Sequence, residues 1–382
     1  MKVLHVITGL TAGGAESQLR LLCRHLDADC EVVMLAGEGL LAAPFRADGV
    51  RVIGLGMGGN RDLRAVGRLV SLMRAGRYDC VHTHLFRAGL YGRLAARLAG
   101  VPRVLATEHS LGEALIEGRR TDRPGLRALY LAGERLGDRT IAVSAATARH
   151  MTAWGVPAAK VTVVPNGVDA GSLAFRPERR TAMRTSLGLA EDTFVVGGVG
   201  RLVATKRFDL VLEAVAAVPG AHLLLVGDGP EGPALRARAA ELGIGDRVHL
   251  PGATDDVSGA LAAMDLFVSP CPEETYGLAV LEALAAGLPV RYAACPALEE
   301  LDPEAAPQAH RVAPDAEVLA AEIRSAAARP GGDHRAAPPA VAHYDIRRIA
   351  AEIDALYRAT PRARPSRAAV RRARTAFRGS RR

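Results

Sequence analysis

The clearest chemistry in the sequence lies in the segment 270–290, PCPEETYGLAVLEALAAGLPV. Two prolines stop the preceding apolar run, and apolar residues then recur at helical spacing, so Glu274 precedes a helix and Glu282 lies roughly two turns inside it. The first N–H groups of that helix, at Tyr276, Gly277 and Leu278, lack partners within the helix and suit an anion such as a diphosphate. Glu282 has mostly apolar neighbours, and vicinal sugar hydroxyls would supply the hydrogen bonds that its carboxylate needs.

Two cations, Arg201 and Lys206, follow the apolar stretch FVVGGVG in the string GRLVATKRFD. A guanidinium fork and a mobile ammonium at the end of a strand are a suitable pair for two phosphates. Lys206 is one of only three lysines among 49 basic residues. Taken alone, these patterns also fit two solvated cations and an ordinary surface helix with two glutamates.

Glycines and histidines follow the strands predicted in the first half of the chain. Gly13 and Gly14 in TAGGAE bring backbone donors close to a phosphate or sugar, although the spacing is not GxGxxG and a plain tight turn would look the same. His82, His84 and His109 follow two further strands, the last in TEHS. A metal site with Glu108 as fourth ligand is one interpretation, and histidines hydrogen-bonded within loops are another. We favour a ligand cleft at these strand ends.

Strand and helix patterns alternate along the whole chain, which indicates an α/β protein with parallel sheets. We expect two facing Rossmann-like domains with an interdomain cleft, over 1–167 and 168–344. An amphipathic helix is predicted over 345–360, and a basic tail, 361–382, should be disordered. Ser144 is predicted to cap a helix, the charged segment 112–124 to form a mobile loop, and the segments 302–314 and 329–340 to be loose.

Composition excludes several classes of protein. The chain has 382 residues, of which 49% are hydrophobic, and no stretch reaches the roughly 20 apolar residues of a membrane span. Its net charge of +8 becomes −2 once the ten arginines from Arg358 to Arg382 are set aside, and only 4% of residues are aromatic, so a nucleic-acid-binding surface is not expected. Five scattered cysteines without CxxC spacing favour reduced thiols in the cytoplasm over structural zinc or disulfides.

These motifs together resemble the retaining glycosyltransferases of family 4, which have the GT-B fold. The resemblance rests on TAGGAE, TEHS, PNGVD, GRLVATKRFD, LLLVGDGP and the two glutamates that seven residues separate, followed by ALAAGLPV. It implies that the domain over 1–167 binds the acceptor, that the domain over 168–344 binds the nucleotide sugar, and that the helix over 345–360 crosses back to the first domain. It implies that Glu282 holds the ribose of a sugar nucleotide and that Glu274 contacts the transferred sugar. It also implies that Arg201 and Lys206 hold the phosphates, that Gly13 and Gly14 face the donor diphosphate, and that His109 is a hydrogen-bond donor beside the reacting sugar.

Other positions receive roles with less support from their motifs. Backbone groups of His249 and Leu250 are expected to read the edge of uracil or guanine, and His84 and Glu108 are assigned to the acceptor. The segment LLLVGDGP either shapes the pocket or touches the nucleotide. After GLPV the chain departs from the family pattern, because it reads RYAACPALEEL, with Arg291 and Cys295 where an apolar residue and glycines are usual.

The sequence therefore predicts a retaining glycosyltransferase that moves a sugar from a UDP- or GDP-sugar to a hydroxyl acceptor, without a cofactor or metal. The acceptor is expected in polysaccharide, glycolipid or glycosylated-metabolite biosynthesis and could be lipid-linked. We expect a cytoplasmic enzyme whose basic tail could hold it at the inner membrane face. Two alternatives stay open: a nucleotide-sugar epimerase of the GT-B fold, which would convert the donor alone, and a non-catalytic nucleotide-sugar-binding protein.

Overall fold

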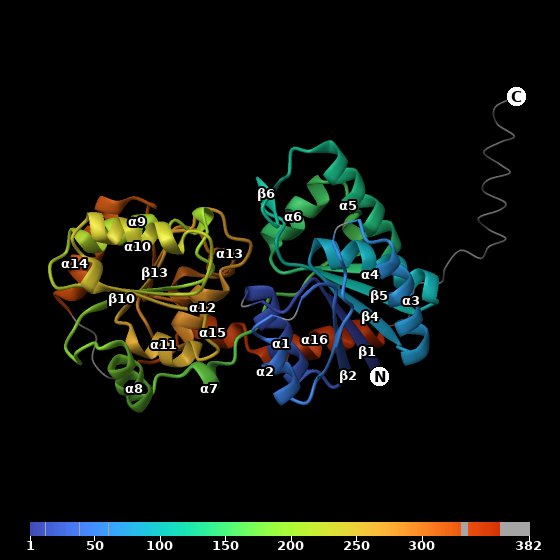
Figure 1. Ribbon diagram of the computed structural model, residues 1–382, viewed down its shortest axis with the longest axis horizontal. Helices are drawn as coiled ribbons and strands as arrows, with labels where there is room; N and C mark the ends of the chain where they lie inside the picture. The colour runs from blue at the N-terminus through green and yellow to red at the C-terminus, as the bar shows by residue number, and fades with distance from the viewer. Residues whose placement is uncertain (12, 38, 60, 330–334, 360–382) are drawn as a thin grey trace, which may run out of the picture.

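The computed structural model describes residues 1–11, 13–37, 39–59, 61–329 and 335–359. Apart from one short antiparallel hairpin, the strands in these residues form two parallel sheets (Figure 1). The first sheet has seven strands in the order β3-β2-β1-β4-β5-β8-β9, and the second has six in the order β12-β11-β10-β13-β14-β15. Both sheets reverse their strand order beside their first strand, and such a switch point is where open α/β sheets bind ligands.

The strands of the first sheet are β1 Lys2–Ile7, β2 Asp29–Met34, β3 Arg51–Gly54, β4 Cys80–His84, β5 Arg103–Glu108, β8 Arg139–Ala142 and β9 Val161–Val163. Those of the second are β10 Val195–Val199, β11 His222–Val226, β12 Val248–Gly252, β13 Leu266–Ser269, β14 Val290–Tyr292 and β15 Ala309–Arg311. The central strands are almost entirely buried, as expected of parallel strands covered on both faces.

Helices cover both faces of each sheet. In the first domain they are α1 Gly14–His25, α2 Ala42–Ala47, α3 Arg64–Gly76, α4 Phe86–Ala99, α5 Pro124–Leu136 and α6 Ala145–Ala153. After the first domain come α7 Ala170–Leu173, α8 Pro177–Leu187, α9 Phe208–Ala216, α10 Gly232–Glu241, α11 Val257–Ala263, α12 Leu278–Ala285, α13 Pro296–Glu299, α14 Ala316–Ala327, α15 Pro339–His343 and α16 Ile346–Arg358. Buried side chains of α3 and α4 pack on one face of the first sheet, whereas α1 and α16 cover the other.

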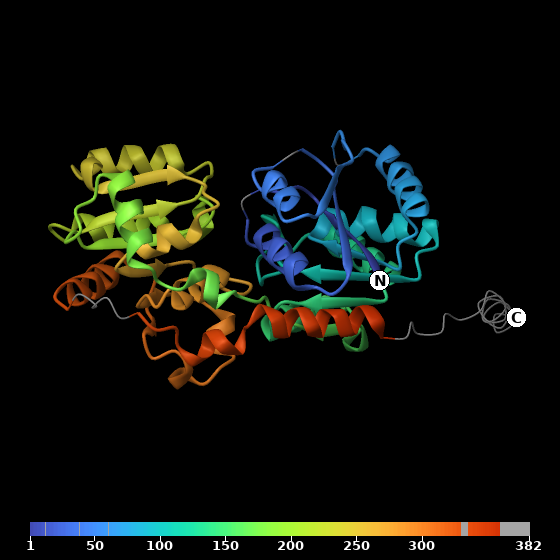
Figure 2. The same cartoon turned by 90° about the horizontal axis from the view of Figure 1, so that it is seen from below.

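The chain passes twice between the domains, and the two passages are hydrogen-bonded to each other. The N–H of Val168 donates to the carbonyl of Tyr344 at 2.8 Å, and the N–H of Ile346 donates back to Val168 at 3.1 Å. The helix α16 then runs along the first domain, although it follows the second in sequence (Figure 2). Its amphipathic face buries Ile349, Ile353 and Tyr357 against the first sheet.

Two sequence predictions in irregular segments were wrong. The segment 112–124 contains an antiparallel hairpin, β6 Leu115–Ile116 and β7 Arg119–Arg120, which is fastened at its base where Glu273 accepts a hydrogen bond from the N–H of Ala114 at 2.8 Å. The segment 302–314, expected to be loose, supplies the edge strand β15, which pairs with β14. The predicted cap on α6 is confirmed, because Ser144 Oγ accepts the N–H of Thr147 at 3.0 Å.

Within the parts of the chain that the structure covers, no helix combines the length and apolar character needed to cross a membrane. The tail, 361–382, to which we assigned disorder and membrane contact, lies outside the described residues.

Candidate active site

The structure brings Lys206 and Glu274 together, although 68 positions separate them. Lys206 ends a short 3-10 helix, Ala204–Lys206, after β10, whereas Glu274 follows β13, the neighbouring strand in the sheet. The ammonium donates to Glu274 Oε1. Burial lowers the pKa of Lys206, but the Glu274 carboxylate outweighs burial and raises it overall. Lys206 is therefore a permanent cation at neutral pH.

The start of α12 lies directly after this ion pair. Gly277 is its N-cap residue, with φ 97°, a backbone conformation that glycine adopts readily. Among the described residues, no group accepts a hydrogen bond from the N–H of Tyr276, Gly277 or Leu278. These donors and the helix dipole thus remain available for an anion.

Glu282 lies farther along α12 and is half-buried. Its carboxyl makes no hydrogen bond or ion pair with another described residue, and burial raises the pKa of that carboxyl to about 7. A half-buried carboxyl without partners fits the predicted role of binding ligand hydroxyls, because those hydroxyls would supply the missing donors.

Across the domain boundary, the start of α1 faces the start of α12. A Cβ atom at Gly14 would lie 3.9 Å from Leu278 Cδ2, so a side chain there would fill the space between the two helices. Glu16, which sequence reasoning missed, folds back over Gly13 and accepts a hydrogen bond from Thr11 Oγ1 at 3.0 Å. Burial raises the pKa of Glu16, while the positive charge of Arg201 in the other domain opposes that rise.

Arg201 is exposed, and its guanidinium makes no hydrogen bond to another described residue. It is close enough to influence both Lys206 and Glu16 electrostatically. Its fork is therefore free to bind an anion beside the ammonium of Lys206.

His109 reaches the same boundary from the end of β5. Its carbonyl accepts a hydrogen bond from Thr275 Oγ1 at 2.7 Å, which ties it to the residue after Glu274. Its Nε2 contacts Nδ1 of His84 at 3.2 Å, and its buried Nδ1 has no hydrogen-bond partner among the described residues. Burial lowers the pKa of His109 to about 4, so the imidazole is neutral and a weak base at neutral pH.

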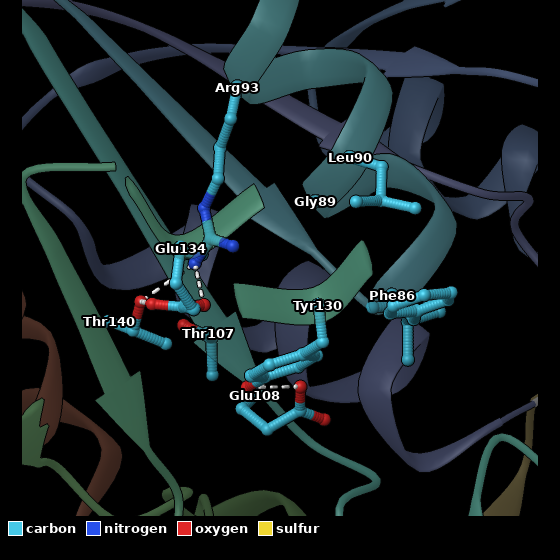
Figure 3. A pocket seen from close by; sticks show the side chains of 11 residues that line it. Phe86, Gly89, Leu90, Arg93, Thr107, Glu108, Tyr130, Glu134 and Thr140 are labelled. Atoms are coloured by element: carbon cyan, nitrogen blue, oxygen red, sulfur yellow. Dashed lines mark hydrogen bonds and ion pairs between the residues drawn. The ribbon is translucent and has the colours of Figure 1, made fainter. Parts of the chain in front are cut away.

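The assignment of His84 and Glu108 to the acceptor stays a prediction, and the structure places both side chains in the interior of the first domain. His84 is 1% exposed and lies between His5 and His109, with burial lowering its pKa. Glu108 turns into the first domain, where Oε1 accepts three hydrogen bonds from Ser110 and Leu111 and Oε2 accepts one from Tyr130 (Figure 3). Burial raises the pKa of Glu108 to about 6. Both residues hold the His109 loop in place: His84 contacts the His109 ring, and Glu108 accepts hydrogen bonds from Ser110 and Leu111.

The pocket in Figure 3 lies between α4, α5 and β5, inside the first domain. Its polar wall is an ion pair between Arg93 and Glu134 at 2.6 Å, and Thr140 bonds to both side chains. Because these groups pair with one another and the pocket does not include Lys206 or Glu274, we assign it to packing.

The remaining donor-side residues lie farther from the ion pair. The His249 ring contacts His222, the first residue of β11, at 3.2 Å and so points toward the amino ends of the strands. The carbonyl of Leu250 accepts a hydrogen bond from Arg236 at 2.9 Å, so one of its acceptor sites is already taken. The glycines of LLLVGDGP shape the site, since a Cβ at Gly227 or Gly229 would collide with the backbone of Gly200 or Leu202.

The atypical segment after GLPV supports the start of α12. Cys295 lies under Gly277, and its thiol contacts the carbonyl of Tyr276 at 3.6 Å. Arg291 turns away and donates to Glu322 on α14 at 2.5 Å. The hydroxyl of Tyr276 donates to the carbonyl of Asn166 at 2.6 Å, so the predicted PNGVD junction holds this loop.

Side chains that could hold a metal ion form two groups within the described part of the chain: His5 with Cys23 and Cys30, and His5 with His82 and His84. Neither includes Glu108 or His109, as the sequence-based metal interpretation required. His82 contacts Tyr357 at 2.6 Å and Thr107 at 2.7 Å through its two nitrogens, and burial lowers its pKa. Within the second group His5 and His84 share a hydrogen bond, and both nitrogens of His82 already have partners outside the group.

Comparisons with known proteins agree with this architecture. The Anabaena protein HepE, solved in complex with UDP-glucose, superposes with a TM-score of 0.76 at 24% identity, over 92% of this chain and 98% of that one. The glycosyltransferase WaaG, involved in lipopolysaccharide biosynthesis, superposes with a TM-score of 0.70 at 18% identity, over 94% of this chain and 100% of that one. Two Rossmann-like domains that face each other at their strand ends define the GT-B fold, and this protein has it.

Sequence comparison gives the family. Residues 12–171 match the model described as Glycosyltransferase Family 4, and residues 193–329 match the model described as Glycosyl transferases group 1. The D-inositol 3-phosphate glycosyltransferase of Mycobacterium tuberculosis is 36% identical over 244 residues, which are 59% of this chain and 49% of that protein. The chain thus matches about half the length of such curated relatives. It belongs to the family 4, group 1 glycosyltransferases.

Proposed function

We propose that this protein is a retaining glycosyltransferase that transfers a sugar from a UDP- or GDP-sugar to a hydroxyl acceptor. The observation that carries the proposal is the convergence of Lys206, Glu274 and the free N–H groups of α12 at one point. A diphosphate placed there would meet two cations and a helix N-terminus. The ribose hydroxyls would then reach Glu282, whose carboxyl has no partner among the described residues.

The reaction follows from these charges. The bond between the sugar C1 and the diphosphate oxygen breaks, and Lys206, Arg201 and the start of α12 stabilise the negative charge that the leaving group gains. Glu274 orients the sugar while its charge is balanced by Lys206. The acceptor hydroxyl forms the new bond to C1 on the same face, and its proton passes to the leaving phosphate oxygen. The low pKa of His109 supports a role as hydrogen-bonding group rather than general base.

The acceptor is the less defined substrate. The name of the mycobacterial relative suggests a polyol phosphate, and HepE and WaaG share only the fold. Polysaccharide, glycolipid and metabolite acceptors, including lipid-linked ones, therefore belong in one panel. Cytoplasmic location, absence of a metal requirement, and membrane contact through the basic tail remain part of this proposal.

A mutational test separates this function from its alternatives. Lys206→Ala and Glu274→Ala should each lower the transfer rate by about 100-fold or more, since they remove charge stabilisation or sugar orientation. Arg207→Ala is the matched control: Arg207 is adjacent to Lys206 and, among the residues that the structure describes, its side chain pairs only with Asp209, so the rate of this variant should stay within about twofold. The assay measures UDP or GDP release and glycosylated product across the panel.

Three results would contradict the proposal. A normal rate in Lys206→Ala or Glu274→Ala would remove the assigned site. Conversion of the donor sugar without acceptor would indicate an epimerase. Tight binding of UDP without turnover of any donor would indicate a binding protein.

A further inference from the structure

A second cluster of reactive side chains lies in the first domain, away from Lys206 and Glu274. His5 comes from β1, Cys23 from α1 and Cys30 from β2, which are the first three elements of the chain (Figure 1). One ligand atom from each side chain lies within 4.8 Å of the other two. All five cysteines are free thiols, so the pair is not joined by a disulfide.

His5 has one ring nitrogen that makes no ordinary hydrogen bond within the described part of the chain. Its side chain is 0% exposed, and Nδ1 contacts Nε2 of His84 at 3.0 Å. Its other nitrogen, Nε2, is buried and makes no hydrogen bond of ordinary geometry to another described residue, and the thiol of Cys30 is a polar neighbour of the ring. Because β1 lies between β2 and β4 in the sheet, the nitrogen that does not face His84 on β4 is the one available to Cys30 on β2. A buried nitrogen left without a partner costs free energy, and a bound cation would remove that cost.

We propose that His5, Cys23 and Cys30 form a binding site for a zinc-type divalent cation. Two thiolates and one neutral imidazole are a ligand set that Zn²⁺ prefers, and their two negative charges cancel the charge of the ion. Both cysteines are half-buried, so water can complete a tetrahedral shell. His84 supplies the outer contact, because a metal on Nε2 fixes the proton of His5 on Nδ1, from where it donates to His84.

The proposed site would stabilise the first βαβ unit, β1-α1-β2, and would take no part in glycosyl transfer. A metal ion held by β1, α1 and β2 would fasten the far end of α1 to the sheet. The other end of α1 begins at the loop of Gly13 and Gly14, which faces α12. The proposed cation is thus a structural support for the helix that carries this loop, and it is independent of the proposed glycosyl transfer.

Cobalt titration tests the site directly. The untagged full chain is stripped of metal, reduced with a non-thiol reductant and titrated with Co²⁺, which gives a thiolate-to-metal absorption band when cysteines bind it. We expect one equivalent per chain, displacement by Zn²⁺, and a higher melting temperature with either ion. Cys23→Ala and Cys30→Ala should lose the band, and His5→Gln should weaken binding by about 10-fold or more, the loss expected even for outer contacts. Cys295→Ala, in the other domain, should behave as wild type.

Several outcomes would overturn the proposal. These are a reduced wild-type chain without the thiolate band, a band that persists in Cys23→Ala and Cys30→Ala, or a band that disappears equally in Cys295→Ala. If an alanine variant fails to fold by circular dichroism, Cys23→Ser and Cys30→Ser replace it, and the same absorption is measured. An oxidisable Cys23 and Cys30 pair that takes up neither Co²⁺ nor Zn²⁺ after reduction would identify the cluster as a disulfide pair instead.

Discussion

Glu282 makes a residue-scale prediction about pH. Its pKa is raised from 4.5 to about 7 because burial disfavours the charged carboxylate. The folded chain therefore holds this proton more tightly than the unfolded chain, so the stability that it contributes is full below about pH 4.5 and is lost as the pH rises through about 7. On going from pH 5 to pH 8, the free energy of unfolding of Glu282→Gln should rise by about 1 to 3 kcal/mol relative to that of wild type, at 1.36 kcal/mol per pKa unit. Urea unfolding at both pH values measures this difference. The exposed Glu178→Gln is the control, and an equal effect of Glu282→Gln at both pH values would contradict the assigned burial.

The position of some single residues in the structure could be predicted from the sequence, and that of others could not. Lys206 and Glu274 follow strands, and the ends of adjacent parallel strands must meet, so their encounter could be predicted without knowing any side-chain direction. Glu108 is the last residue of β5, but the direction of its side chain depends on Tyr130, a partner on α5 that no motif indicates. The contact between Cys23 and Cys30 was equally hidden, because it depends on how α1 packs on β1 and β2.

At the scale of elements, apolar runs predicted the central strands, whereas the short polar strands were not predicted. The strand β15 reads AHR and is mostly exposed, so nothing in its composition separates it from a loop. It forms because the edge of β14 offers unpaired backbone groups, as the pairing of Val290 with Ala309 shows. The β6–β7 hairpin is similar, since two-residue strands carry no periodicity that a pattern could detect.

The start of α12 makes a prediction about glycine. Gly277 and Gly188 both have positive φ, but only at Gly277 would an added Cβ collide with another group, the thiol of Cys295. Gly188→Ala should cost about 1 kcal/mol from backbone strain. Gly277→Ala should cost about 2 to 4 kcal/mol because crowding adds to that strain. Thermal or urea unfolding measures both variants. Cys295→Ala in the Gly277→Ala background should recover about 1 kcal/mol or more, and strict additivity of the two changes would disprove the contact.

At the scale of the whole molecule, the sequence indicated two sheets and a returning helix, because strand patterns resume after PNGVD and end in an amphipathic helix. It could not show that the two passages between domains pair as Val168 with Asp345, or that Gly167 packs against the backbone of Ile346. Such contacts join positions far apart in the chain and leave no local pattern. They make α16 part of the first domain's core, and the stability of that domain should therefore depend on the end of the chain.

Tyr357 tests this dependence. Its ring is 2% exposed in the core beneath β1 and β4, and its hydroxyl contacts Nδ1 of His82 at 2.6 Å. Tyr357→Ala should cost about 3 to 5 kcal/mol for the lost ring, and Tyr357→Phe about 1 to 3 kcal/mol because His82 Nδ1 loses its hydrogen-bond partner. Arg358→Ala, which breaks only an exposed ion pair with Asp27, should cost at most about 1 kcal/mol.

Hydrogen exchange shows where this loss of stability falls. In Tyr357→Ala the amides of β1 and β4 should exchange faster, whereas those of β10 and β11 should keep their rates, because α16 packs on the first sheet and not on the second. Equal acceleration in both sheets would mean that the domains unfold as one unit. Unchanged exchange in β1 and β4 would mean that α16 is not part of the first domain's core. The pattern we expect requires that the last described helix stabilises the first strands of the chain.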